Sequence, residues 1–196
     1  MTLKSRSYRK RMNERRRKLV ERYYENKIHG IELFIDNVHD PHNVAAILRS
    51  VDGFGIAKVN LYYTVETLPN FGKAGTKSSA SAKKWVRRER VEDLDVFAAE
   101  KKAAGYRFVG ADRTDTSIAL PEYAFPDRCI IVMGSEHHGM RPEVAALLDD
   151  TVHIPMTGMV ESYNVSVAAA VIMYEVFRQH GRGLISREEL GVSEAR

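Results

Sequence analysis

The sequence predicts an α/β fold in which helices cover both faces of a mostly parallel sheet. Apolar strand-like runs alternate with helical patterns from residue 31 to residue 180, which is typical of such sheets. Of the 196 residues, 44% are hydrophobic, which is enough for the core of one ordinary domain. Neither an internal repeat nor a linker interrupts the alternation, so we expect one folded domain.

The first half of the chain is expected to contain a basic arm, two strands and one helix between them. The arm is residues 1–28, and "RKRMNERRRKLVERYYE" within it has the composition of a helix. The segments "IELFIDNV" (31–38) and "KVNLYYT" (58–64) are rich in strand-forming residues. Between them, "NVAAILRSVDGFG" (43–55) has helical spacing, and we expect Asn43 to be its N-cap.

The second half is expected to contain three more strands and three more helices. Apolar residues run together in "RFVGAD", "CIIVMGS" and "TVHIPM", which indicates strands. The last helix contains "VAAAVIM" and is apolar on all sides, so we expect it to be buried. The strands are expected at 107–112, 129–135 and 151–156, and the helices at 91–105, 141–150 and 164–180.

The composition of the chain limits the cellular compartment and the kinds of metal or disulfide site that we expect. No apolar run reaches the roughly 18 residues of a membrane span, and the basic N-terminus lacks the apolar stretch of a secretory signal. We therefore expect a cytoplasmic protein with no membrane partner. The single cysteine, Cys129, excludes an internal disulfide and a multi-cysteine metal site, and its apolar neighbours indicate a buried thiol.

The charge is unevenly distributed along the chain. Residues 1–24 hold ten Lys or Arg and two Glu, a net charge of +8, while the remainder holds 20 basic and 24 acidic residues, a net charge of −4. A basic arm on a mildly acidic body suggests a polyanionic partner such as a nucleic acid. The alternative is a solvated tail without a partner.

Several common catalytic and binding motifs are poorly matched. "GKAGTKSS" (72–79) and "GSEHHG" (134–139) lack the residue order of a phosphate-binding loop, and no GxGxxG follows the first strand. The pairs His39/His42 and His137/His138 lack the helical spacing of a zinc site, so we expect loop histidines and no metal. A GxSxG nucleophile motif is also missing from the sequence.

Three other segments carry polar groups where a strand meets a helix. They are "DNVHDPHNVAAILRSVDGFG", "IIVMGSEHHGM" and "IPMTGMVESYNVSVAAAVIMYE". Each has an ordinary structural interpretation: helix caps with an Arg49–Asp52 ion pair, a tight turn, and a further cap at Ser162 or Asn164. Each also has a functional one, in which Arg49 projects beside an anion and the glycines let a ligand approach the backbone.

Taken together and in this order, the three segments closely resemble the sequence motifs of the SpoU/TrmH branch of the SPOUT RNA methyltransferases. The resemblance covers about residues 30–180, and "SSASAKKWV" (78–86) fits the loop between the first two motifs. It implies methylation of a ribose 2′-OH in RNA by S-adenosylmethionine. It also implies the SPOUT fold, whose C-terminal part is a deep trefoil knot, and a homodimer that covers the outer face of the last helix.

The resemblance also implies the site residues. The catalytic residues carried over by position are Asn43, Arg49, Glu136, Ser162 and Asn164. Arg49 would hold a phosphate and orient the hydroxyl, because a guanidinium is very hard to deprotonate. The residues implied for cofactor binding, on three loops, are Gly110, Ala111, Met133, Gly134, Gly139, Ile154, Met156, Met159, Ser162 and Tyr163, of which Tyr163 departs from the Leu usual in close relatives.

The implied substrate is tRNA, with guanosine 18 of the D-loop as the expected target. The alternatives are an rRNA 2′-O-methyltransferase of the same family and a non-catalytic RNA-binding module. We divide the chain into the arm (1–28), the methyltransferase domain (29–182) and a short tail (183–196). The expected RNA-binding residues are Arg9, Lys10, Arg11, Arg15, Arg16, Arg17, Lys77, Lys83 and Lys84.

Overall fold

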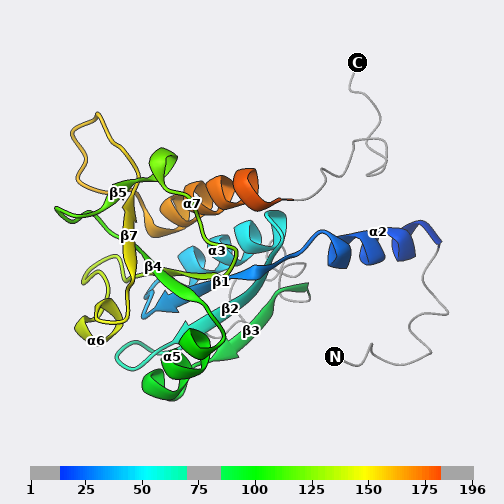
Figure 1. Ribbon diagram of the computed structural model, residues 1–196, viewed down its shortest axis with the longest axis horizontal. Coiled ribbons are helices and arrows are strands. Elements are labelled where there is room, and N and C mark those ends of the chain that lie inside the picture. Colours follow the sequence, from blue (N-terminus) through cyan, green and yellow to red (C-terminus); the bar gives the residue numbers. More distant parts are fainter. Residues whose placement is uncertain (1–13, 70–84, 182–196) are drawn as a thin grey trace.

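The protein is built on one parallel sheet, seen in a computed structural model that describes residues 14–69 and 85–181 (Figure 1). Every pair of neighbouring strands in it runs parallel. The predicted α/β class with a parallel sheet is therefore confirmed. In spatial order the seven strands are β3 (Arg87–Arg90), β2 (Ile56–Tyr62), β1 (Ile28–Asp36), β6 (Cys129–Met133), β4 (Arg107–Ala111), β7 (Asp150–His153) and β5 (Ile118–Ala119).

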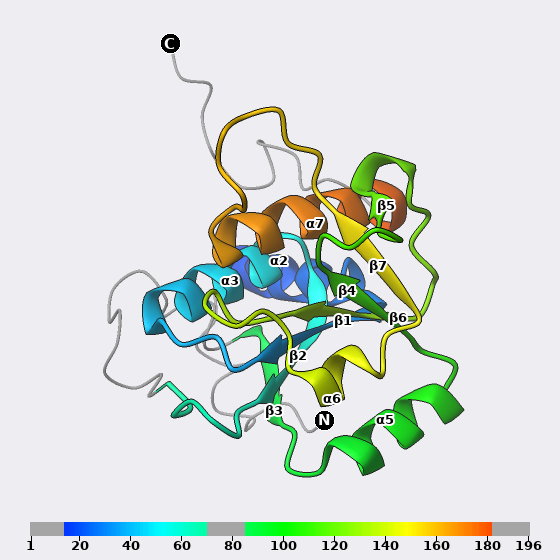
Figure 2. The same cartoon turned by 90° about the vertical axis from the view of Figure 1, so that its left-hand side faces the viewer.

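Helices cover both faces of the sheet, as predicted. Figure 2 shows α3 and α7 together on one face and α5 and α6 on the other. The trefoil knot implied by the resemblance stays a prediction. The helices are α2 (Glu14–Glu25), α3 (Pro41–Gly53), α5 (Leu94–Ala103), α6 (Pro142–Ala145) and α7 (Val165–His180), with a 3₁₀ turn, η1, at Leu120–Glu122.

Strand β6, in the middle of the sheet, is apolar throughout because both of its faces are covered. In β6 all five residues are buried, including Cys129. Successive side chains point to opposite faces. Ile131 and Met133 therefore join the larger apolar cluster, which includes residues of α3 and α7, while Ile130 and Val132 join the cluster that includes residues of α5.

Local differences from the predicted elements have identifiable causes. The N-cap of α3 is Asp40, whose side chain accepts a hydrogen bond from His42 N at 2.8 Å, so the prediction of Asn43 as the cap was wrong. Pro41 occupies the first turn, where a missing N–H costs nothing. Strand β3 was not predicted, because "RRER" has the charged composition of a sheet edge. Strand β5 has only two residues, and α6 is shorter than expected.

One carboxylate, that of Glu32, lies inside the fold on the α5 face of the sheet. It accepts hydrogen bonds from Lys101 Nζ at 2.5 Å and Asn60 Nδ2 at 2.8 Å, and Lys58 Nζ lies 4.0 Å away. Glu32 is only 6% exposed. Because a buried charge needs partners, this cluster ties α5 to the centre of the sheet.

Helix α2 is attached to the domain through its last turn. Tyr23 Oη donates a hydrogen bond of 2.7 Å to Asp52 on α3, and Lys27 Nζ donates one of 3.1 Å to the Trp85 carbonyl. The end of the basic arm is therefore part of the folded structure. In the described part of the chain, no helix is long and apolar enough to cross a membrane.

Candidate active site

The three motif segments meet at one edge of the sheet. Because the strands are parallel, their carboxyl ends lie at the same edge, and the loops that follow β1, β6, β4 and β7 are neighbours there. The chain order reverses between β1 and β6, since β2 and β3 lie on one side and β4, β7 and β5 on the other. Open α/β sheets bind their ligands at such a switch point.

The start of α3 places Asn43 at this edge. Because Asp40 provides the cap, the Asn43 side chain is not needed for capping and can reach across the switch point. Its Nδ2 donates a hydrogen bond of 2.5 Å to Glu136 Oε1, in the loop after β6. The first and second motif segments are thus joined side chain to side chain.

Asn164 joins the third motif segment to the first. Its Nδ2 donates to Asn43 Oδ1 at 3.1 Å, while its Oδ1 accepts from Ser166 N at 2.9 Å and caps α7. Of the two predicted caps, Ser162 and Asn164, it is Asn164 that caps the helix, and the same side chain also belongs to the site. The resulting chain of hydrogen bonds runs from Glu136 through Asn43 to Asn164.

Arg49 lies on α3, nearly two turns beyond Asn43, and is exposed. The alternative interpretation of this residue, an ion pair with Asp52, is not observed; Asp52 instead accepts the hydrogen bond from Tyr23. Arg49 makes no ion pair with any residue that the structure describes. Its guanidinium is therefore exposed at the surface and unpaired within residues 14–69 and 85–181.

The loop after β6 is a tight backbone turn. Ser135 and Gly139 exchange two backbone hydrogen bonds of 2.9 Å, and Gly139 has φ +65°. A Cβ at Gly134 would lie 2.4 Å from Gly139 C and 2.5 Å from Met140 N, so no side chain fits there. The two glycines are required by the turn itself, and the turn holds Glu136 against Asn43.

The residues expected to bind the cofactor differ in how far they are exposed to solvent. Met133 is buried at the end of β6, and a Cβ at Gly110 would lie 2.5 Å from Leu148 Cδ1, so close packing accounts for this glycine. The loop between β7 and α7 is open to solvent, with Met159 fully exposed and Tyr163 43% exposed. Ala111, Ile154 and Met156 are half-buried. Ser162 is exposed and makes no hydrogen bond with the described residues.

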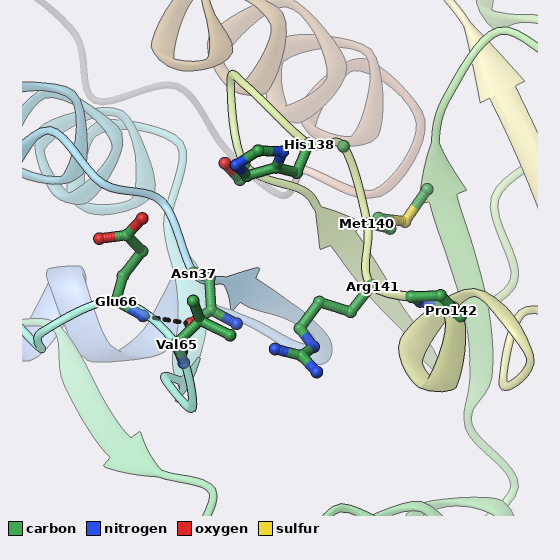
Figure 3. A pocket seen from close by; sticks show the side chains of 9 residues that line it. Asn37, Val65, Glu66, His138, Met140, Arg141 and Pro142 are labelled. Carbon is green, nitrogen blue, oxygen red and sulfur yellow. Dashed lines mark hydrogen bonds between the residues drawn. The ribbon is translucent and has the colours of Figure 1, made fainter.

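A cavity of about 240 Å³ lies between the loop after β6 and the loop after β2 (Figure 3). Its floor is organised by Asn37, which has φ +49° and whose Oδ1 accepts three backbone N–H bonds of 3.0 Å from Thr64, Val65 and Glu66. Sequence analysis missed this residue; an Asn directly after a strand is a signal for the left-handed conformation. The lining residues are Asn37, Val65, Glu66, Ser135, His138, Gly139, Met140, Arg141 and Pro142.

The loop histidines are partly as expected. His39 lies in the loop before α3, where its Nδ1 is 2.6 Å from Glu66 Oε2, and this hydrogen bond raises the pKa of His39. His42 differs from the expectation, since it lies in the first turn of α3. Among residues 14–69 and 85–181, no cluster of three or more His, Cys, Asp or Glu could hold a metal ion.

Most of the expected RNA-binding residues cannot be placed. Arg15 and Arg16 lie in α2, and Arg17 is exposed there with its Nε 3.7 Å from Glu21 Oε1. Such a surface pair contributes little to stability and leaves the guanidinium accessible. The residues that lie outside the described ranges are Arg9, Lys10, Arg11, Lys77, Lys83 and Lys84.

Comparisons with known proteins identify the family of this chain. The model of the SpoU rRNA Methylase family matches residues 30–174. Over 182 residues the chain is 31% identical to a tRNA (guanosine(18)-2′-O)-methyltransferase of Aquifex aeolicus, covering 92% of this chain and 85% of that protein. A 23S rRNA (guanosine-2′-O-)-methyltransferase of Acinetobacter baylyi is 32% identical over 161 residues, 82% of this chain and 64% of that protein.

Solved structures give the same result. The crystal structure of the A. aeolicus TrmH/SpoU tRNA modifying enzyme has a TM-score of 0.72 at 30% identity, covering 90% of this chain and 86% of that one. The SpoU methyltransferase AviRb from Streptomyces viridochromogenes, in complex with AdoMet, has a TM-score of 0.66 at 26% identity, covering 77% and 58%. Since the family model spans well over half of the sequence and the same segments build the site, the chain belongs to the SpoU rRNA methylase family.

Proposed function

We propose that this protein transfers a methyl group from S-adenosylmethionine to the ribose 2′-OH of guanosine 18 in the D-loop of tRNA, in the cytoplasm. Its membership of the SpoU family makes it a methyltransferase. The observation that carries the proposal is the chain of hydrogen bonds from Glu136 through Asn43 to Asn164, which joins all three motif segments at one point. A binding module without catalysis would not require this junction.

We assign S-adenosylmethionine to the loops after β4, β6 and β7. The backbone of Gly139 and Met140 packs directly against Gly134, and Ile154 and Met156 offer half-buried apolar surface. The residues that would hold the cofactor are Gly110 and Ala111, Met133 to Gly139, and Ile154 to Asn164. The cofactor supplies a methyl group that its sulfonium centre has already activated.

Because the methyl group is already activated, the residues of the chain contribute mainly by positioning. Asn43 and Asn164 fix the start of α3 relative to the start of α7, and Glu136 holds Asn43 from the other side. Arg49 would bind a phosphate beside the target ribose, since its guanidinium is exposed and unpaired among the described residues. We assign the proton of the 2′-OH to that phosphate or to water, because a guanidinium is a very weak base.

The function is tested with labelled S-adenosylmethionine and separate pools of total tRNA and rRNA. We expect label in tRNA, at the 2′-O of guanosine 18. Label in rRNA alone would support the runner-up, an rRNA 2′-O-methyltransferase, which the A. baylyi relative favours. RNA binding without transfer of label would support the non-catalytic module.

Arg49→Ala tests the site within this assay. We expect a loss of roughly hundredfold in kcat/KM, the size of effect that mispositioned reactants produce. Arg128→Ala is the matched control, because Arg128 is an exposed arginine just before β6, at the opposite end of that strand from the motif segments. Near-normal transfer by the Arg49 variant would refute its role.

The homodimer is part of the same proposal. On α7, Val167, Val171 and Tyr174 are 47%, 37% and 56% exposed and follow one another at helical spacing. Within one chain this face of the helix is therefore not buried, and a second copy would cover the stripe, as the resemblance implies. Light scattering should give twice the chain mass, and Val171→Lys should shift the protein towards the monomer.

The basic arm would supply non-specific affinity for tRNA. Deleting residues 1–13 removes five basic residues and leaves the Tyr23–Asp52 bond in place. We expect weaker tRNA binding and a shallower salt dependence, because fewer counterions would be released. Unchanged affinity at low salt would show that this stretch is a solvated tail.

A further inference from the structure

The cavity on the β2 side of the β6 loop shares only that loop with the segments assigned to the cofactor. Its walls come from the end of β1, the loop after β2 and the loop after β6, whereas the cofactor loops follow β4, β6 and β7. The two regions share the β6 loop, where Glu136 meets Asn43. A group bound in the cavity would therefore lie beside the junction of Glu136 and Asn43, next to the cofactor loop that follows β6.

The cavity is preformed by hydrogen bonds to the end of β1. Asn37 holds the loop after β2 through three backbone N–H groups, and its Nδ2 donates to Asp36 at 2.7 Å. The other oxygen of Asp36 accepts from Arg141 N at 2.7 Å, which fixes the far wall. Burial raises the pKa of the Asp36 carboxyl, and these hydrogen bonds oppose that rise. A rigid cavity loses little entropy when it binds a ligand.

The lining suits a flat ring with polar edges. Val65, Met140 and Pro142 contribute apolar surface, and His138 and the Arg141 guanidinium are planar groups on which a base can stack (Figure 3). The Glu66 carboxylate is held in place on one oxygen by His39. Its other oxygen, Oε1, accepts no hydrogen bond from the described residues and is available to a ligand.

The charges of the lining disfavour a phosphate. Glu66 places a carboxylate in the lining, and the Nε of the lining residue Arg141 is paired with Glu143 Oε1 at 2.6 Å. A carboxylate with an available oxygen selects N–H donors. Among the four bases, guanine presents two adjacent N–H donors on its Watson–Crick edge, at N1 and N2, and these match the two oxygens of one carboxylate.

We propose that this cavity binds the guanine base of the methylated nucleotide and that Glu66 is the residue that recognises it. The assignment rests on the proposed function for the presence of RNA, and it adds the site that makes the enzyme specific for guanosine. His39 is a positioning residue, because it acts by holding Glu66. The base would leave its stack to enter, as bases in RNA loops do.

The test compares guanosine with inosine, which lacks the N2 amino group, at the target position of a tRNA. Wild-type enzyme should lose about tenfold or more in kcat/KM on inosine, the discrimination typical of one bidentate contact. In Glu66→Gln the guanosine rate should fall and the ratio of the two rates should drop below about threefold. Glu100→Gln, a matched change on the exposed surface of α5, should leave both rates and their ratio unchanged.

Binding of free nucleotides gives a second readout that does not require methyl transfer. Guanosine monophosphate should shift the methyl NMR signals of Val65 and Met140, and adenosine monophosphate should not. If wild type methylates guanosine and inosine equally and Glu66→Gln changes nothing, the guanine site is refuted and the methyltransferase stands. If no RNA is methylated but guanosine monophosphate alone shifts these signals, the proposed function fails and the guanine site stands; no shift with either nucleotide overturns the site.

Discussion

Replacing Asn43 by Asp is the sharpest test of the junction between the motif segments. The change keeps the shape of the side chain and the oxygen that accepts from Asn164. It removes the N–H that donates to Glu136 at 2.5 Å and puts a second carboxylate in its place. The variant therefore removes the hydrogen bond to Glu136 and keeps the hydrogen bond from Asn164.

The expected cost follows from two effects. A hydrogen bond to a charged group contributes about 1.5–3 kcal/mol, and the exposure of this site favours the lower value. Repulsion between two carboxylates about 4 Å apart adds about 1 kcal/mol in water. The sum is about 2.5 kcal/mol, or a loss of roughly sixtyfold in kcat/KM. Because the two side chains can rotate apart into solvent, the free energy of unfolding should change by less than about 1 kcal/mol.

The assay is the initial rate of methyl transfer to tRNA, with urea unfolding measured on the same preparations. The control is the same substitution in a Glu136→Gln background, where the new amide at position 136 would donate to the new carboxylate at position 43 and the repulsion is absent. There, Asn43→Asp should cost less than about threefold, because the two residues are energetically coupled. An equal cost in both backgrounds would show that Asn43 does not act through Glu136.

Three further predictions concern stability and reactivity. Glu32→Ala should lower the free energy of unfolding in urea by about 3 kcal/mol, since it leaves the Lys101 ammonium buried without its carboxylate; a change under about 1 kcal/mol would contradict this. Gly134→Ala should abolish most transfer and lower the melting temperature, because its Cβ would meet Gly139 C at 2.4 Å; a variant with wild-type rate would disprove that requirement. Burial raises the pKa of the Cys129 thiol to about 12, so at pH 8 a disulfide reagent should react with it after unfolding in urea and not before.

The predictability of the fold followed the strength of the local patterns. The buried strand β6 and the long helix α7 were identified because five consecutive buried residues and a sixteen-residue apolar helix leave clear signals. Strand β3 was not predicted, because its sequence "RRER" is charged like a surface loop. It forms a strand by pairing with β2. Tertiary pairing decided that element, and no local preference could have revealed it.

The structure brings together three of the residues predicted from the motifs, but the sequence did not show how they would be arranged. Asn43, Glu136 and Asn164 were identified from their motifs, yet spacing along the chain does not say which of them touch. The incorrectly predicted N-cap of α3 illustrates the reason. Asp40 and Asn43 are both good N-cap residues, and which of them caps the helix depends on where β1 ends and the helix begins. Glu66 lies outside every predicted motif, and it was identified from the structure because it lines a cavity.

The junction at Asn43 has a consequence for the biosynthesis of the enzyme. Its hydrogen bond to Glu136 spans 93 positions of the chain, and its hydrogen bond to Asn164 spans 121. Asn164 is the residue at which α7 begins. A nascent chain that has not yet produced α7 can form most of the sheet while Asn43 lacks one of its two partners. The site is therefore completed only after α7 has been synthesised, and fragments cut before Asn164 should fold in part and transfer no methyl group.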